Sequence, residues 1–372
     1  MPVLRNNPES RNNLDPNNIA AGDNSAALQQ QVQDAINTRT PLNICGSGSK
    51  HFLGRAAHGE LLSLSAHRGI VEYDPRELVL TARAGTPLAE IEATLAEAGQ
   101  MLTFEPPHFG DLATLGGTIA CGLSGPRRPY AGAARDAVLG CQLINGKGEL
   151  LRFGGQVMKN VAGYDVSRLM VGAHGTLGLL LEISLKVLPR PAASLTLLYE
   201  CTQDEAISRM SRLLSQPMPV DAASYHAGHC YLRLAGSEQA VQHAQKQMGG
   251  DTLKESTPFW HSLREQQLPF FKSKNPLYRV MVKPATPAIA IAGDWLLDWG
   301  GAQRWLLSDE PLALIRERVA AAGGSVSQFR NGTQHDEVFP PLPAPLFNIH
   351  QRLKLSFDPL RIFNPDRLYA GL

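Results

Sequence analysis

The chain has 372 residues, of which 43% are hydrophobic and 19% are charged, and its formal net charge is +1. This length and apolar content suffice for two domains with hydrophobic cores. The nearly neutral charge provides no general attraction to nucleic acid or to an anionic membrane, so we expect no nucleic-acid partner.

The spacing of the cysteines indicates which metal sites the chain could form, and its apolar runs indicate its cellular compartment. The five cysteines form no CxxC or CxxxC pair, which argues against an iron–sulfur cluster or structural zinc, so we expect free thiols and no metal. Residues 1–24 are rich in Asn and Pro and lack an apolar signal-peptide core, and no run approaches the ~18 apolar residues of a membrane helix. We therefore expect a flexible N-terminal tail and a cytoplasmic protein.

The first elements predicted along the chain lead into a small-residue loop. Apolar residues on one face predict a helix over 26–36, and a short strand follows over 42–45. Successive N–H groups of the loop after this strand can point at a pyrophosphate, although a plain tight turn is equally compatible with the pattern. The loop matches neither the GxGxxG fingerprint nor a P-loop. Its residues are Gly46, Ser47, Gly48, Ser49 and Lys50.

A glycine-rich stretch over 113–136 is the next distinctive segment. A strand over 79–83 and a helix over 88–98, which Thr86 and Pro87 are expected to cap, precede it. The stretch contains five glycines and three arginines, and its only acidic residue is the last one. Glycine lets backbone amides approach a ligand where a Cβ would clash. We interpret the stretch as a wall around a large anionic cofactor.

The remaining elements predict two α+β parts. Strands over 137–144 and 150–153 are expected to form a hairpin, and a long strand over 179–188 follows without regular βαβ alternation. From about residue 193 the glycine-rich loops disappear, and we expect a second domain packed as a cap. Its expected helices cover 202–214, 238–248 and 311–322, and its expected strands cover 225–234, 278–282, 304–307 and 325–329.

Six segments occur in the order found in the flavin-binding domain of the vanillyl-alcohol oxidase and p-cresol methylhydroxylase superfamily, which the chain therefore resembles. They are the loop at 45–54, TLGG at 114–117, Arg135-Asp136, GYD at 163–165, GTLG at 175–178 and the terminal FDP and FNP. Within that superfamily, the segments EPPHFG, ACGLSGPRRP, FGGQVMKNVAGYDVSRLMVG and LREQQLPFF resemble the FAD-binding subunit of the bacterial glycolate oxidase (glycolate dehydrogenase) complex. The similarity covers nearly all of the chain from about residue 26.

The resemblance implies an α+β protein with a two-part FAD-binding domain of the p-cresol methylhydroxylase type and a smaller α+β cap domain. The division that we expect is a tail over 1–24, an FAD-binding domain over 25–192, a cap domain over 193–345, and a segment over 346–372. This C-terminal segment, a helix followed by two proline turns, is expected to return to the FAD-binding domain.

The resemblance also assigns cofactor contacts. The backbone from Gly46 to Lys50 would bind the pyrophosphate of FAD, Leu180 would lie by the adenine, and Asn364 would lie near the isoalloxazine edge. Covalent-flavin relatives carry a histidine in the first loop where this chain has Ser49, which implies that FAD is bound non-covalently. The residues expected along the ribityl and flavin side are Pro107, Thr114, Gly116, Gly117, Ala120 and Ser124.

Residues for the substrate chemistry are harder to assign. Oxidation of a 2-hydroxy acid needs a base for the hydroxyl proton, a hydride acceptor and a cation for the carboxylate. Each candidate near the predicted flavin could instead neutralise the pyrophosphate, contact another subunit or lie in solvent. The candidates are His108, Arg127, Arg128, Lys159 and Tyr164.

A metal-binding substrate motif of related enzymes is missing from the sequence. Single-chain 2-hydroxy-acid dehydrogenases of the superfamily carry HxGDGN and a later GEHG, where this chain has HAGHC over 226–230 and RNGT over 330–333. We therefore expect no metal at His226 or His229, and the main substrate site is expected in a partner.

The resemblance implies an FAD-dependent glycolate dehydrogenase that works as part of a complex and passes electrons toward a quinone. The expected partners are a larger FAD-containing glycolate oxidase subunit, an iron–sulfur subunit and a small 2-hydroxy acid, and the complex could hold the chain peripherally at the inner membrane. Two alternatives stay open at this point. They are a self-sufficient FAD-dependent oxidase of hydroxy acids or sugars, and a structural assembly subunit with a vestigial flavin site.

Overall fold

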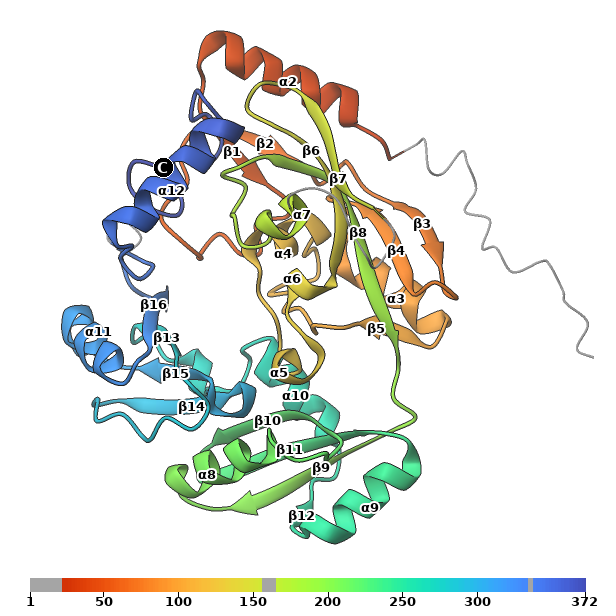
Figure 1. Ribbon diagram of the computed structural model, residues 1–372, viewed down its shortest axis with the longest axis vertical. Coiled ribbons are helices and arrows are strands. Elements are labelled where there is room, and N and C mark those ends of the chain that lie inside the picture. Colours follow the sequence, from red (N-terminus) through yellow and green to blue (C-terminus); the bar gives the residue numbers. More distant parts are fainter. Residues whose placement is uncertain (1–21, 156–164, 334–336) are drawn as a thin grey trace, which may run out of the picture.

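The computed structural model describes residues 22–155, 165–333 and 337–372. Two sheets dominate it, one in the upper half and one in the lower half of Figure 1. Neighbouring strands within both large sheets are antiparallel, and the connections mix strands and helices irregularly. The predicted α+β class is confirmed.

The upper sheet is built around the long strand β8. Its strand order is β3-β4-β8-β6-β7, and β5 pairs with the end of β8. A separate parallel pair, β1 with β2, lies beside it. The strands are β1 (Leu42–Cys45), β2 (Glu60–Ser63), β3 (Ile70–Asp74), β4 (Val79–Arg83), β5 (Gln100–Leu102), β6 (Val138–Ile144), β7 (Leu150–Gly154) and β8 (Leu179–Pro189).

Helices of the upper half cover this sheet and enclose one apolar core. The core contains Leu88, Ile91 and Leu95 of helix α3, as the spacing of these residues predicts. Thr86 does not cap this helix, because its hydroxyl bonds the backbone of Gly69 instead. The helices are α2 (Ser25–Thr38), α3 (Leu88–Glu97), α4 (Leu115–Cys121), α5 (Arg128–Ala131), α6 (Ala134–Ala137) and α7 (Val166–Leu169).

The lower sheet has the strand order β12-β9-β11-β10-β14-β15-β13-β16. Its strands are β9 (Ala193–Glu200), β10 (Val220–His226), β11 (His229–Gly236), β12 (Asp251–Thr252), β13 (Leu277–Met281), β14 (Asp294–Asp298), β15 (Gln303–Leu307) and β16 (Ser325–Arg330). Its helical elements are α8 (Gln203–Leu213), α9 (Glu238–Met248), α10 (Ser256–Arg264), η1 (Pro269–Lys272), η2 (Trp299–Gly301) and α11 (Leu312–Ala321).

The single strand predicted over 225–234 is wrong, because the chain reverses in its middle. Strands β10 and β11 form a hairpin in which His226 pairs with His229. The two residues between them, Ala227 and Gly228, both have positive φ, at 49° and 79°. Two consecutive left-handed residues form the turn that suits the twist of a two-residue hairpin. A capping box of Thr202 and Glu205 begins helix α8.

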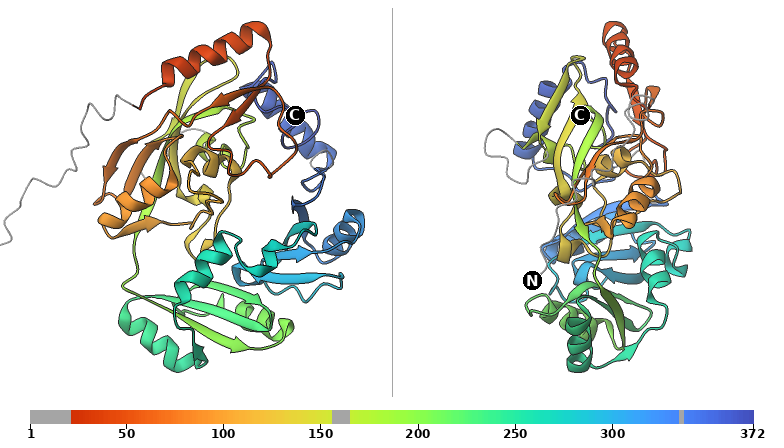
Figure 2. Two further views of the ribbon diagram at one scale, coloured as in Figure 1. Left: turned by 180° about the vertical axis from the view of Figure 1, so that it is seen from behind. Right: turned by 90° about the vertical axis from the view of Figure 1, so that its right-hand side faces the viewer.

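The two halves share a mixed apolar core. Leu53 and Leu123 of the upper half pack in one cluster with residues of the lower half, among them Trp260 and Phe270. The indole Nε1 of Trp299 also donates a 2.9 Å hydrogen bond to the carbonyl of Gly125 in the glycine-rich stretch. Figure 2 shows the lower half directly beneath this stretch.

The C-terminal helix α12 (Ala344–Phe357) lies in the upper half (Figure 1), and the segment that follows it pairs with β1 through a bridge between Phe363 and Leu42. A buried ion pair fixes its end, since the Lys354 ammonium lies 2.9 Å from the Asp358 carboxylate. Lys354 also donates to the carbonyls of Thr176 and Phe363 at 2.8 and 2.7 Å. The Asp358 carboxylate accepts from the amides of Ile362 and Phe363. All these charges and polar groups are therefore paired.

Replacing Lys354 by Met is expected to lower the free energy of unfolding by about 3–5 kcal/mol, because it leaves the Asp358 carboxylate buried without its cation. Chemical denaturation measures this difference. The matched control is Arg352→Met, at an exposed position of the same helix, which is expected to change stability by less than about 0.5 kcal/mol. Equal stability of the two variants would contradict this account of the C-terminal segment.

Candidate functional site

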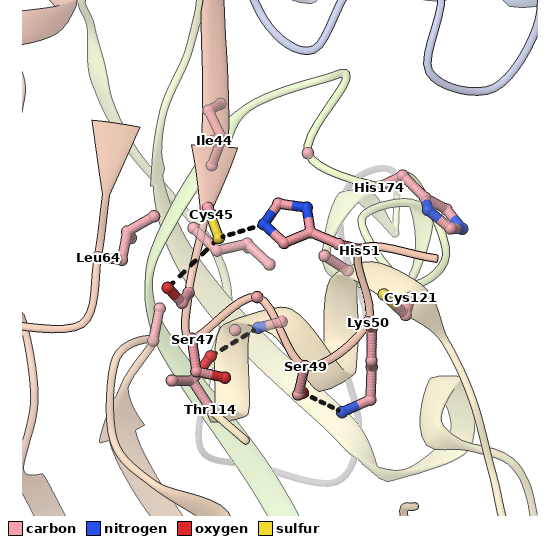
Figure 3. Close-up of a pocket in the computed structure, with 18 of the residues that line it drawn as sticks. Ile44, Cys45, Ser47, Ser49, Lys50, His51, Leu64, Thr114, Cys121 and His174 are labelled. Carbon is pink, nitrogen blue, oxygen red and sulfur yellow. Dashed lines mark hydrogen bonds between the residues drawn. The ribbon is translucent and has the colours of Figure 1, made fainter. Parts of the chain in front are cut away.

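A cavity of about 750 Å³ opens between the end of β1, helix α4 and the turn after α7. We call it the loop cavity, because the loop over 46–51 forms one side of it (Figure 3). Ten of the residues predicted to bind the cofactor line it, namely Gly46, Ser47, Gly48, Ser49, Lys50, Thr114, Gly116, Gly117, Ala120 and Leu180.

Three predicted cofactor residues do not line the loop cavity. Pro107 and Ser124 line a smaller pocket at the boundary between the two halves. Asn364 lies behind the cavity, where its side-chain oxygen accepts from the amide of Ile44 at 2.7 Å and its Nδ2 donates to the carbonyl of His174 at 2.7 Å. Asn364 therefore positions two sides of the cavity.

The loop over 46–51 presents backbone donors to the cavity. The amides of Gly46, Ser47 and Ser49 donate to no acceptor in the part of the chain that the structure describes. Only glycine fits at position 46, because a Cβ there would lie 2.2 Å from the Thr114 hydroxyl oxygen. Unpaired amides that converge on a cavity can bind an anion.

Two buried cations add positive charge to the loop cavity. Lys50 is 7% exposed, and its ammonium donates to the carbonyl of His108 at 3.0 Å and to the Ser49 hydroxyl at 3.4 Å. Burial lowers the pKa of Lys50 from its ordinary value. Arg367 is equally exposed and donates to the carbonyls of Arg55 and His51. An anionic ligand would offset the cost of burying these charges.

Helix α4 forms the opposite side of the cavity. The hydroxyl of Thr114 caps it by accepting from the amide of Gly117 at 3.3 Å. Gly116 allows the helix to approach β4 closely, because a Cβ at this position would lie 2.7 Å from the Cβ of Ala84. The amide of Gly116 donates to the carbonyl of Ala84 at 2.7 Å. Gly116 thus brings helix and sheet together as well as lining the cavity.

Sequence reasoning missed a thiol and imidazole cluster in the same cavity. The thiol of Cys45 lies 3.3 Å from Nε2 of His51, and Cys121 and His174 also line the cavity (Figure 3). Burial raises the pKa of Cys121 to about 11, so its thiol is neutral. Arg367 was missed as well. His174 directly precedes the GTLG motif over 175–178, which offered a signal, whereas Arg367 lies in no motif.

Three of the candidates for substrate chemistry do not line the loop cavity. The ring of His108 points to Glu92, with Nε2 3.2 Å from the carboxylate, and only its carbonyl reaches Lys50. Arg127 forms an ion pair with Asp221 at 2.9 Å. Arg128 stacks on Trp299 at 4.4 Å. Lys159 and Tyr164 lie outside the described residues.

His226 and His229 stand where related enzymes carry the metal-binding motif, and each contacts a neighbouring residue of this chain. The ring of His226 packs edge-on against Phe270, and Nδ1 of His229 lies 2.8 Å from the carbonyl of Ala227. Among the residues that the structure describes, no group of three or more His, Cys, Asp or Glu side chains is arranged to hold a metal ion.

The loop cavity fits a dinucleotide cofactor. Its unpaired amides and the Lys50 ammonium suit phosphate oxygens. The absence of a side chain at position 46 leaves the backbone accessible, and Leu180 with Ala120 provides apolar surface for planar rings. Anion-binding backbone and apolar surface thus occur in one cavity.

Comparison with known proteins agrees with this geometry. Residues 16–154 match the family described as FAD binding domain. Glycolate oxidase subunit GlcE of Escherichia coli is 52% identical over 350 residues, which cover 94% of this chain and 99% of that protein. Glycolate oxidase subunit GlcD of Bacillus subtilis is 31% identical over 185 residues, or 49% of this chain and 39% of that protein.

A solved structure of alkyldihydroxyacetonephosphate synthase has the same fold, with a TM-score of 0.66 and 14% identity over 92% of this chain and 74% of that chain. The family match and the cavity together define a flavoprotein with an FAD-binding domain. Within this class, the chain belongs to the glycolate oxidase subunit GlcE family. In the described segments, none of the helices has the length and apolar character needed to cross a membrane.

Acidification is expected to destabilise the protein through His174. Burial and the neighbouring Arg367 lower the pKa of His174 to about 4, so the unfolded chain takes up this proton at higher pH than the folded chain does. The contribution of His174 to stability is therefore present above about pH 6.5 and is lost as the pH falls toward 4.

His174→Asn is expected to make stability about 1–2 kcal/mol less sensitive to a change from about pH 7.5 to about pH 5. Asparagine tolerates the positive φ of 51° at this position. Denaturant unfolding at the two pH values measures the effect, and His243→Asn, at an exposed position of α9, is the control. An unchanged pH dependence in His174→Asn would show that this imidazole is not responsible.

Proposed function

We propose that this chain is the FAD-binding subunit of a multi-subunit complex that oxidises glycolate to glyoxylate. The observation that carries the proposal is the 52% identity to GlcE over nearly the full length of both proteins, combined with a cavity suited to FAD. FAD supplies a two-electron acceptor when it is bound. In this proposal electrons leave through iron–sulfur clusters of a partner toward a quinone.

Residues of this chain would hold and orient the cofactor. The amides of the loop over 46–51 would donate to phosphate oxygens, and Lys50 would neutralise their charge. The imidazole of His51 and the thiols of Cys45 and Cys121 would remain around the bound cofactor. We propose non-covalent binding, because Ser49 stands in the loop where covalent-flavin relatives carry a histidine.

We also propose the division into an FAD-binding domain over 25–192, a cap domain over 193–345 and a C-terminal segment over 346–372. Separate hydrophobic clusters support it, since one cluster belongs to the upper sheet and two others belong to the lower sheet. The contacts of Lys354 and Asn364 support the assignment of the last segment to the FAD-binding domain.

The partners that we propose are a larger FAD-containing subunit, an iron–sulfur subunit and glycolate as the small 2-hydroxy acid. We also propose a cytoplasmic location, with peripheral association at the inner membrane through the complex. Co-purification of the chain with its partners, followed by measurement of flavin per subunit, tests the proposal. Yellow protein that glycolate reduces only in the complex supports it, whereas a complex without flavin on this chain overturns it.

The same measurement separates two other functions. If the isolated yellow chain is reduced by glycolate, it is a self-sufficient oxidase. If the chain is colourless but binds its partners, it is a structural subunit. Both outcomes would contradict the proposal in different ways.

Lys50→Met is expected to weaken FAD binding by about ten- to hundredfold, because a hydrogen bond to a charged group contributes about 1.5–3 kcal/mol. Titration of the flavin-free protein with FAD, followed by flavin fluorescence, measures the dissociation constant. Lys147→Met, at an exposed position between β6 and β7, is the control and should bind FAD normally. Equal affinities of the two variants would contradict a role for Lys50 at the phosphates.

A further inference from the structure

A small pocket at the boundary between the two halves holds polar groups that the assignments above do not use. It is smaller than the loop cavity. One side is the backbone over 123–126 in the glycine-rich stretch, and the other side comes from the lower sheet. We call it the arginine pocket. Its charged and amide side chains are Arg264, Gln266, Arg279, Asp298 and Gln303.

Arg279, on β13, has donors that remain available in this pocket. Its Nε donates to the side-chain oxygen of Gln303 at 2.6 Å, and its guanidinium lies over the ring of Trp299 at 5.0 Å. Its two terminal nitrogens have no hydrogen-bond or ion-pair partner among the residues that the structure describes. The guanidinium is thus oriented by Gln303 and Trp299, and its free edge matches a carboxylate in two parallel hydrogen bonds.

Gln266 offers the complementary group. It is 8% exposed, and its side-chain oxygen has no hydrogen-bond partner among the described residues. A buried acceptor without a donor is unfavourable. A ligand that satisfies both Arg279 and Gln266 therefore carries an acceptor pair and a separate donor, such as a carboxylate and a hydroxyl.

Asp298 is the acidic residue that would oppose an anion in the pocket. Its carboxylate accepts from the amide of Trp299 at 2.8 Å and from Nε2 of Gln303 at 3.3 Å. Burial raises the pKa of Asp298 to about 7. The negative charge that it brings to the pocket is thus reduced near neutral pH and below.

We propose that the arginine pocket binds a small 2-hydroxy acid, whose carboxylate pairs with Arg279 and whose hydroxyl donates to Gln266. The choice of glycolate as the probe rests on the proposed function. The pocket adjoins the loop cavity, because Phe109 lines the pocket and lies 5.8 Å beneath the Lys50 ammonium, which lines the cavity.

Tryptophan fluorescence provides a direct test on the purified flavin-containing chain. Trp305 lines the pocket and Trp299 lies under Arg279, so occupancy should change their emission. Titration with sodium glycolate is expected to give a saturable change with a dissociation constant in the roughly millimolar range. Sodium acetate, which lacks the hydroxyl, should bind about tenfold more weakly, and sodium chloride at equal ionic strength should give no saturable change.

Two variants separate the parts of the proposal. Arg279→Lys keeps the charge but loses the paired donors and should weaken glycolate binding by about tenfold or more. Gln266→Leu should bind glycolate and acetate equally, because it removes the acceptor for the hydroxyl. Arg318→Met, at an exposed position of α11 on the same sheet, is the control and should bind glycolate normally.

The proposal is overturned if glycolate gives no saturable response, or if Arg279→Lys and the parent chain bind glycolate equally well. It is also overturned if chloride competes with glycolate as well as glycolate itself does, because that result would indicate a non-selective anion site. Flavin content is measured on the same samples. A chain that retains flavin but does not bind glycolate overturns this proposal alone, whereas a chain without flavin in the complex overturns the proposed function.

Discussion

The two hydrogen bonds of the Asn364 side chain hold the loop cavity together. One joins the end of β1 to the C-terminal segment, and the other joins the same segment to the turn at His174. These two places are separated by about 130 residues in the sequence, and β1 directly precedes the loop that presents its amides to the cavity. The distance across the cavity therefore depends on a residue that does not line it.

A buried polar segment can perform this role only if its own charges are paired. Lys354 and Asp358 are almost inaccessible to solvent, and together they use the carbonyls of Thr176 and Phe363 and the amides of Ile362 and Phe363. An ion pair without these additional partners would cost more in desolvation than it gains. The pairing fixes the direction in which the chain leaves α12 and thereby places Asn364.

Local chemistry explains which parts of the site could be predicted from the sequence. Glycines that permit close backbone approach, as at positions 46 and 116, are visible in the sequence because their effect is local. Arg279, Gln303 and Gln266 gave no such signal, because strand pairing and the packing of α10 bring them together. The hairpin at Ala227 was missed for a related reason, since alanine rarely adopts a positive φ.

Glu265 links the two cavities physically. Its carboxylate accepts from the amides of His108 and Phe109 and lies 2.7 Å from Nε of Arg264. Although burial opposes ionisation, these donors lower the pKa of Glu265 below its usual value. A single charged carboxylate therefore fixes the turn that carries Phe109, the side chain between Lys50 and the arginine pocket. Because this carboxylate fixes the turn, it sets both the position of Phe109 in the arginine pocket and the ring that lies beneath the Lys50 ammonium.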